Sequence, residues 1–126
     1  MQLAAGLAAR VKLTVGDADT AQALGSGDVP VLATPRVVAL VEAATVAATA
    51  AQLELGSTTV GTRIELDHLA ATPVGRQVVA EAHLVVVDGR RLTFEVALHD
   101  GEIMAARGRV ERVVVDRSRF LSKAAD

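Results

Sequence analysis

Apolar and polar residues alternate along most of the chain, and one long apolar segment interrupts this alternation. Alternation with a period of two is typical of strands that are buried on one face. It predicts strands at residues 9–15, 58–70, 76–87, 91–99 and 102–115. Two-residue hairpin turns are favoured by the dipeptides Asp88-Gly89 and Asp100-Gly101, and Pro73-Val74-Gly75 marks an earlier turn. The last four strands are therefore predicted to form an antiparallel meander.

The segment from Thr34 to Gly56 follows a different pattern and predicts a helix of about five turns. Thr34 is a favourable N-cap residue, and Pro35 suits the first helical position. Gly56 is a suitable C-terminal stop. Because Ala, Val and Leu occupy almost every side of this segment, we expect a helix that is buried on most sides. A sheet wrapped around it, a partner subunit, or both would provide that burial.

The connecting segments complete the predicted architecture. Residues 16–30 are rich in Gly, Asp and Ser, which predicts a loop with one helical turn at 20–24. The polar tail at 116–126 is expected to fray. One strand, one long helix and four further strands predict an α+β fold, in which an antiparallel sheet wraps around a central helix. This is the hotdog arrangement, and residues 1–126 are expected to form a single domain of this kind.

Composition narrows the possible partners. The 126 residues carry a net charge of −2 and include no Trp or Tyr, so a nucleic-acid partner is not expected. Cysteine is absent, which excludes disulfides and cysteine zinc sites and is compatible with the cytoplasm, where we expect the protein. Three dispersed histidines do not predict a metal site. The apolar stretch at 37–51 carries Glu42 and is too short to predict a membrane span. No motif for a cofactor is present.

Glu42 is the only charged residue between Arg36 and Glu54. A carboxylate on a helix usually reaches solvent, but this helix offers little polar surface. Burying the carboxylate would cost free energy unless a histidine or a hydroxyl group held its charge. Glu42 is therefore a candidate for chemistry as well as for an ordinary solvent-exposed acid.

Three further residues share this ambiguity. His68 falls on the same parity as Ile64 and Leu66, so its imidazole is expected on a buried face. Such a histidine is either a satisfied core residue or a catalytic one. Thr34 caps a helix, and its hydroxyl would also lie beside free N–H groups that can polarise a carbonyl oxygen. Gly61 lies inside a strand and indicates a bulge or a close backbone approach.

The remaining polar residues are weaker candidates for a functional role. His83 and His99 are expected at the surface. Seven arginines, at positions 90, 91, 107, 109, 112, 117 and 119, are candidates for phosphate contacts with a nucleotide, although most are expected at solvated strand edges.

Four stretches together resemble the fluoroacetyl-CoA thioesterase family of hotdog proteins. They are ATPRVVALVEAA, VGTRIELDHLAATPVG, VVDGRRLTFEVALHDG and RVERVVVDRSRF, and the similarity spans roughly residues 29–120. In that family a threonine precedes the helix and a glutamate follows eight residues later, as Thr34 and Glu42 do here. A glycine lies seven residues before a histidine that is followed by a short run ending in Thr-Pro. Gly61 and the run His68-Leu-Ala-Ala-Thr-Pro match this pattern.

The resemblance implies an acyl-CoA thioesterase that needs no cofactor and acts as a homodimer, with tetramers also possible. It implies that Thr34, Glu42 and His68 form the catalytic group and that the backbone of Gly61 contacts the thioester. The fluoroacetyl-specific member has phenylalanines before the threonine, whereas GSGDVPVLA has none here. A different small acyl group is therefore an open alternative.

Two other functions are compatible with the same residues. A hotdog protein can bind acyl thioesters without hydrolysing them, and a hotdog hydratase can act on an enoyl-CoA. No Asp/His motif for a hydratase is present beyond His68.

Overall fold

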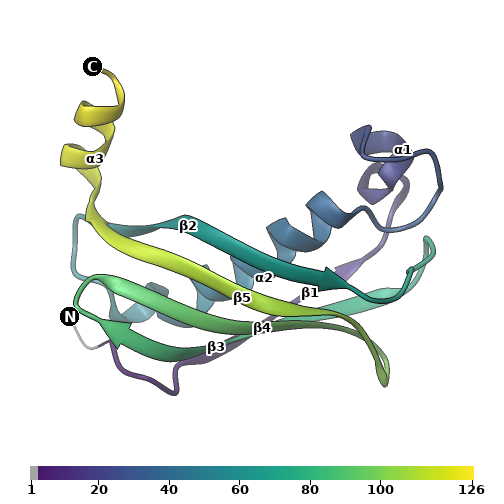
Figure 1. Cartoon of the computed structure of the whole chain (residues 1–126), viewed down its shortest axis with the longest axis horizontal. Coiled ribbons are helices and arrows are strands. Elements are labelled where there is room, and N and C mark those ends of the chain that lie inside the picture. The colour runs from purple at the N-terminus through teal and green to yellow at the C-terminus, as the bar shows by residue number, and fades with distance from the viewer. Residues whose placement is uncertain (1–2) are drawn as a thin grey trace.

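A five-stranded antiparallel sheet curls around one long helix in the computed structural model, which describes residues 3–126 (Figure 1). The strand order is β1-β3-β4-β5-β2, so β1 and β2 form the two edges. The strands are β1 (Ala8–Thr14), β2 (Ser57–His68), β3 (Gln77–Asp88), β4 (Arg91–Asp100) and β5 (Ile103–Asp116). The helices are α1 (Ala21–Leu24), α2 (Thr34–Thr49) and α3 (Arg117–Ala124), with 3-10 turns at Asp17–Asp19 and Ala50–Gln52. The predicted α+β architecture is confirmed.

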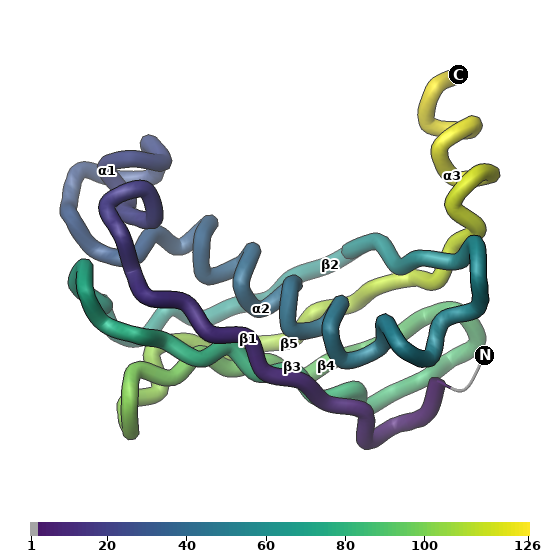
Figure 2. The backbone as a smooth tube through the Cα atoms, turned by 180° about the vertical axis from the view of Figure 1, so that it is seen from behind, coloured from purple at the N-terminus to yellow at the C-terminus, as the bar shows by residue number. Residues whose placement is uncertain are grey.

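Helix α2 packs one side on the sheet, as the reverse view shows (Figure 2). Its buried side includes Val37, Val41 and Ala44, which belong to the same core as Phe94 and Leu84. The other side carries an exposed apolar stripe, formed by Ala39, Ala43, Val46 and Ala47 and continued by Ala50 of the following 3-10 turn. The sheet of one chain therefore provides only part of the burial that the sequence predicts for this helix.

Helix α2 is also shorter than predicted. It ends at Thr49, tightens into a 3-10 turn, and is followed by extended backbone at Leu53. The hydroxyl of Thr49 donates to the carbonyl of Thr45, and such bonds from a side chain to the preceding turn weaken a helix. Gly56, the predicted stop, instead lies in the turn before β2 with a φ of 87°.

A β-bulge at Thr62 changes the parity of strand β2. Gly61 pairs with Arg112 of β5, and Arg63 pairs with the adjacent Glu111, so Thr62 is the extra residue. A bulge of this kind was one of the two predictions for Gly61. The bulge places Gly61 on the same face as His68, although the two residues are separated by an odd number of positions. Val60, which alternation alone assigns to the buried face, consequently pairs with Val113 on the other face.

The C-terminal tail is helical, contrary to the expectation that it frays. Asp116 caps α3 by accepting a hydrogen bond from the Arg119 N–H at 2.9 Å, and the Arg117 N–H donates to the Gly56 carbonyl oxygen. No residue of α3 is buried. The helix extends away from the sheet on the side of β2 (Figures 1 and 2).

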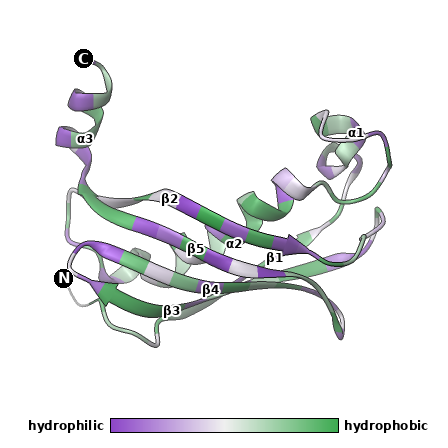
Figure 3. Cartoon of the chain, in the orientation of Figure 1, coloured by the Kyte–Doolittle hydropathy of each residue, from purple (hydrophilic) through white to green (hydrophobic). Residues whose placement is uncertain are grey.

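The face of the sheet away from α2 is mainly polar along β2 and β5 (Figure 3). Its side chains pair across strands, as in the ion pairs of Arg63 with Glu111 and of Arg109 with Glu95. Among residues 3–126, no helix is long and apolar enough to cross a membrane.

Gly108 allows β2 and β5 to lie close together near the end of β2. It pairs with Leu66, and a Cβ atom at this position would overlap the backbone carbonyl oxygen of Glu65. We predict that Gly108→Ala lowers the free energy of unfolding by about 1–3 kcal/mol, because neither strand can yield without losing hydrogen bonds. Urea denaturation measures this loss. Gly16→Ala is the control, since its Cβ would make only an ordinary contact at 3.5 Å. Equal stability of the two variants would contradict the prediction.

Candidate functional site

The hydroxyl of Thr34 forms a hydrogen bond with the imidazole of His68. The two atoms, Oγ1 and Nδ1, lie 2.7 Å apart. Helix α2 begins one residue earlier than predicted, because Ala33 is the N-cap and Thr34 is the first helical residue. The hydroxyl group of Thr34 is therefore directed to His68 and does not cap the helix. The start of α2 and the end of β2 meet at this bond.

The second nitrogen of His68 has no hydrogen-bond partner among the described residues. Its Nε2 atom is buried and forms no hydrogen bond within residues 3–126. Buried polar atoms in native proteins are nearly always satisfied by protein, water or a ligand. Within the described residues, this nitrogen is therefore available to a ligand or to water. The prediction that the imidazole of His68 lies on a buried face is confirmed for its Nε2 atom.

Glu42 is held by an arginine. Its Oε2 atom accepts a hydrogen bond from Nη1 of Arg112 at 2.9 Å, and the two side chains are 32% and 7% exposed. Gly61 lies against the same carboxylate, because a Cβ atom there would be 2.5 Å from Oε2. The close approach predicted for Gly61 is therefore present as well as the bulge. The partner predicted for Glu42 was a histidine or a hydroxyl group, and that prediction is wrong.

Arg112 is the site residue that the sequence prediction did not single out. Its Nε donates to the Thr59 hydroxyl and its Nη2 to the Thr59 carbonyl, both at 3.0 Å. These bonds satisfy a guanidinium that lies almost entirely out of solvent. Arg112 is therefore not among the arginines at solvated strand edges, which most of the seven were expected to be. Alternation along the strand could have predicted its burial, since Arg112 shares its parity with the buried residues Val110 and Val114.

The site residues form two pairs, Thr34 with His68 and Glu42 with Arg112, and Gly61 lies against the second pair. Thr34 and Glu42 are separated by eight residues of helix, or about 12 Å along the axis. None of the hydrogen bonds of residues 3–126 joins the Thr34–His68 pair to the Glu42–Arg112 pair. The structure brings all four predicted residues to one strip between α2 and β2, and a substrate or water would have to bridge the two pairs.

Asp19 ties the preceding loop to the start of α2. Its carboxylate accepts from the Gly16 N–H at 2.8 Å and from Nε of Arg36 at 2.9 Å, while its carbonyl accepts from the Ala33 N–H. The Gly16 hydrogen bond, followed by the Arg36 guanidinium, lowers the pKa of Asp19 below its ordinary value. These bonds fix the residue immediately before Thr34.

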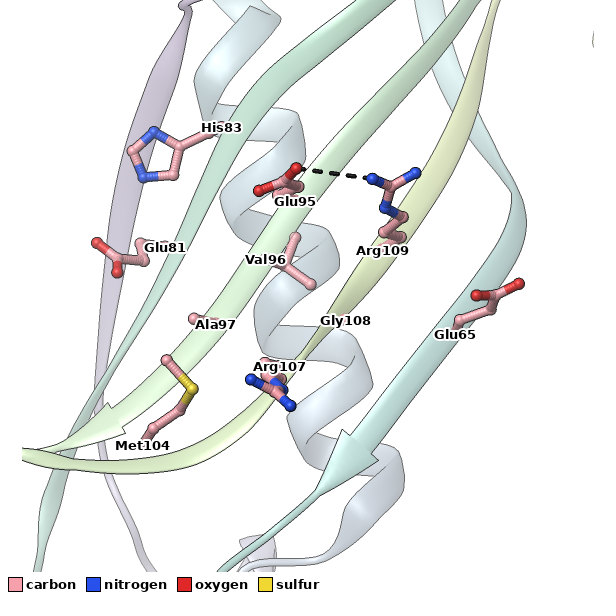
Figure 4. Close-up of a pocket in the computed structure, with 10 residues that line it drawn as sticks. All are labelled: Glu65, Glu81, His83, Glu95, Val96, Ala97, Met104, Arg107, Gly108 and Arg109. Carbon is pink, nitrogen blue, oxygen red and sulfur yellow. Dashed lines mark ion pairs between the residues drawn. The ribbon is translucent and has the colours of Figure 1, made fainter.

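A separate hollow of about 450 Å³ lies on the sheet face away from α2 (Figure 4). Glu81, His83 and Arg107 are among its lining residues, and none of the four predicted site residues is. His83 is exposed there, as predicted, whereas His99 is only half-exposed and bonds to Glu81. Within residues 3–126, no group of acidic or histidine side chains is arranged to hold a metal ion.

Comparison with known proteins assigns the chain to a family. The model of the fluoroacetyl-CoA-specific thioesterase family matches residues 15–118. The chain belongs to this family. The fluoroacetyl-CoA thioesterase of Streptantibioticus cattleyicolor is 43% identical over 93 residues, which cover 74% of this chain and 67% of that protein.

Solved structures agree with this membership and with the hotdog fold. A mutant of the fluoroacetyl-CoA thioesterase in complex with acetyl-CoA matches with a TM-score of 0.92 and 33% identity, over 98% of this chain and 97% of that one. A Thermus thermophilus protein of the thioesterase superfamily matches with a TM-score of 0.91 and 25% identity, over 99% and 93% of the two chains.

Asp19 should make stability depend on acidity. Its lowered pKa means that its bonds stabilise the fold fully above its ordinary pKa of 3.8, and that this contribution is lost as pH falls through the lowered value. We predict that Asp19→Asn costs about 1–2 kcal/mol at pH 7. The difference from the unmodified chain should shrink below pH 3.8. Urea titrations at pH 7 and below pH 3.8 measure this difference in stability. A difference that does not vary with pH would contradict the stabilising role of the Asp19 carboxylate.

The Glu42–Arg112 pair should show strong coupling. Arg112→Met leaves a partly buried carboxylate without its partner, and we predict a loss of about 1–3 kcal/mol in the free energy of unfolding, below the range for fully buried pairs because Glu42 is partly exposed. Glu42→Gln in the Arg112→Met background should cost less than it does alone. A double-mutant cycle by denaturation tests this, and additive effects would refute the coupling.

Proposed function

We propose that the protein hydrolyses a small acyl-CoA thioester to the free acid and coenzyme A. The observation that carries this proposal is the Thr34–His68 hydrogen bond on the same strip as Glu42, in a chain of the fluoroacetyl-CoA-specific thioesterase family. The relatives named above act on fluoroacetyl-CoA or bind acetyl-CoA, and this favours a short acyl group. We also propose a cytoplasmic location, where such a substrate would meet the enzyme.

The substrate carbonyl would lie at the N-terminus of α2. The N–H groups of Thr34 and Arg36 belong to the first turn, where no preceding helical carbonyl is available, and Pro35 has no N–H group. With the proton of His68 on Nδ1, this nitrogen donates to Thr34 Oγ1, and the threonine O–H can donate to the carbonyl oxygen. These donors would stabilise the negative charge that develops on that oxygen.

Glu42 would activate the attacking water. Arg112 occupies Oε2, and no hydrogen bond within residues 3–126 uses Oε1, so this atom can accept a proton. The water oxygen bonds to the carbonyl carbon, its proton passes to Oε1, and the carbonyl electron pair moves to the oxygen. The pair then returns as the C–S bond breaks, and the departing thiolate takes the proton from Glu42.

Attack by Glu42 itself, through an anhydride, is the competing route. A single turnover in water enriched in heavy oxygen separates the two routes, because only the anhydride route can leave the label on Glu42.

The same proposal includes a homodimer. Strand β2 is an edge of 12 residues, and edge strands present unpaired backbone groups that a second strand can bond. The exposed apolar stripe of α2 could pack on the same stripe of another copy. Pairing β2 with β2 around a two-fold axis would bury both features, which supports a symmetric dimer.

Replacing the candidate groups should slow turnover without unfolding the chain. We predict that His68→Ala and Glu42→Ala each reduce kcat/KM by at least about 10²-fold, the lower range for positioned acid–base groups. Thr34→Ser should retain more activity than Thr34→Ala. The measurement is thiol release across short, branched, aromatic and long acyl-CoAs.

His83→Ala is the matched control, because this histidine is exposed on the opposite face of the sheet. Unimpaired turnover in His68→Ala would refute the assignment. Saturable acyl-CoA binding without any thiol release would establish a binding protein instead, and loss of enoyl-CoA absorbance would establish a hydratase.

A further inference from the structure

Helix α3 has few tertiary contacts with its own chain, and these are mainly with β5. All eight of its residues are exposed, including Phe120 and Leu121 at 41% and 58%. Its root is fixed by the Asp116 cap and by the bond from Arg117 to Gly56. A short helix with so few tertiary contacts is marginal in water, so a partner surface would account for the exposed apolar residues.

The direction of α3 indicates where this partner surface lies. In both views the helix extends past β2, beyond the free edge of the sheet (Figures 1 and 2). Asp116 pairs with Ser57, the first residue of β2. When two β2 strands pair antiparallel about their middle, Ser57 of one lies opposite His68 of the other. The root of α3 then lies next to the end of the partner's β2.

That end of the molecule is complementary to α3 in two respects. It exposes the apolar residues Leu24, Val29 and Leu69. It also exposes three carboxylates, Asp17, Asp28 and Asp67, that form no ion pair within residues 3–126. Helix α3 carries Arg117, Arg119 and Lys123, has no acidic residue, and makes no ion pair within the described chain. The apolar and basic side chains of α3 are therefore complementary to the apolar and acidic side chains at the opposite end of the chain.

We propose that α3 is an arm that docks on a second copy of this chain, beside the end of its β2 that carries His68. This inference rests on the dimer proposed above and adds an element to it. Each dimer would contain two such contacts, because an isologous interface repeats every contact. The arm of one subunit would then cover the flank of the thioester site in the other.

Cross-linking tests the contact directly, because the chain has no cysteine. Chains carrying Leu69→Cys and Leu121→Cys are co-expressed and treated with a short bismaleimide. We predict a covalent heterodimer. Ile103→Cys, co-expressed with Leu121→Cys, is the control, since Ile103 is 54% exposed like Leu69 but lies at the start of β5. No excess of product over this control would overturn the proposal.

Truncation of the chain before α3 tests how much this helix contributes to the stability of the dimer. A chain that ends at Asp116 loses only exposed residues, so its unfolding transition should be retained. We predict that its dimer dissociates at least tenfold more readily in sedimentation, and that high salt reduces the difference.

The outcomes distinguish the arm from the proposed enzyme. A dimer of unchanged affinity after truncation overturns the arm, and thiol release by that dimer leaves the proposed function intact. A raised KM for every acyl-CoA with an unchanged dimer would show that α3 binds the nucleotide and not a second copy, which also overturns the proposal. A full-length chain that sediments as a monomer overturns both the dimer and the arm.

Discussion

The single inserted residue at Thr62 determines which side chains β2 presents to α2. Without it, Gly61 and His68 would lie on opposite faces of the sheet, because side chains alternate along a strand. With it, one strand delivers a glycine to the Glu42 carboxylate and an imidazole to the Thr34 hydroxyl. The candidate site therefore depends on the backbone irregularity as much as on the residues themselves.

The charge of Glu42 imposes a second constraint on the same strip. An unpaired carboxylate at this depth would destabilise the fold, and Arg112 offsets it only because Thr59 satisfies two further donors of the guanidinium. Arg112 takes one carboxylate oxygen and leaves the other unused, so the pair can satisfy the fold and still present an acceptor to a ligand. Gly61 is needed for the same arrangement, because any larger residue would displace the carboxylate.

The fold follows from the sequence more completely than the site does. Alternation and turn residues define all five strands, and the apolar segment after Thr34 defines the central helix. Position and parity made Thr34, Glu42, Gly61 and His68 candidates, and the resemblance grouped them into one predicted site. Alternation could not find the parity change at Thr62, because a bulge has no pattern of its own. Arg112 was missed because an arginine is assumed to be solvated, although the buried parity of its strand indicated otherwise. Helix α3 was missed because a polar tail has no core of its own to predict from.

Unpaired backbone groups and exposed apolar side chains of a single copy lie together on one side of the chain. The free edge of β2, the exposed apolar stripe of α2 and the projecting helix α3 all lie on this side, whereas the opposite face of the sheet pairs its charges internally. The buried, unbonded Nε2 of His68 belongs to β2 as well. A partner that covered this side would exclude water from the strip between α2 and β2, which would strengthen the hydrogen bonds that polarise a carbonyl. Dimer formation and catalysis would then depend on the same strand.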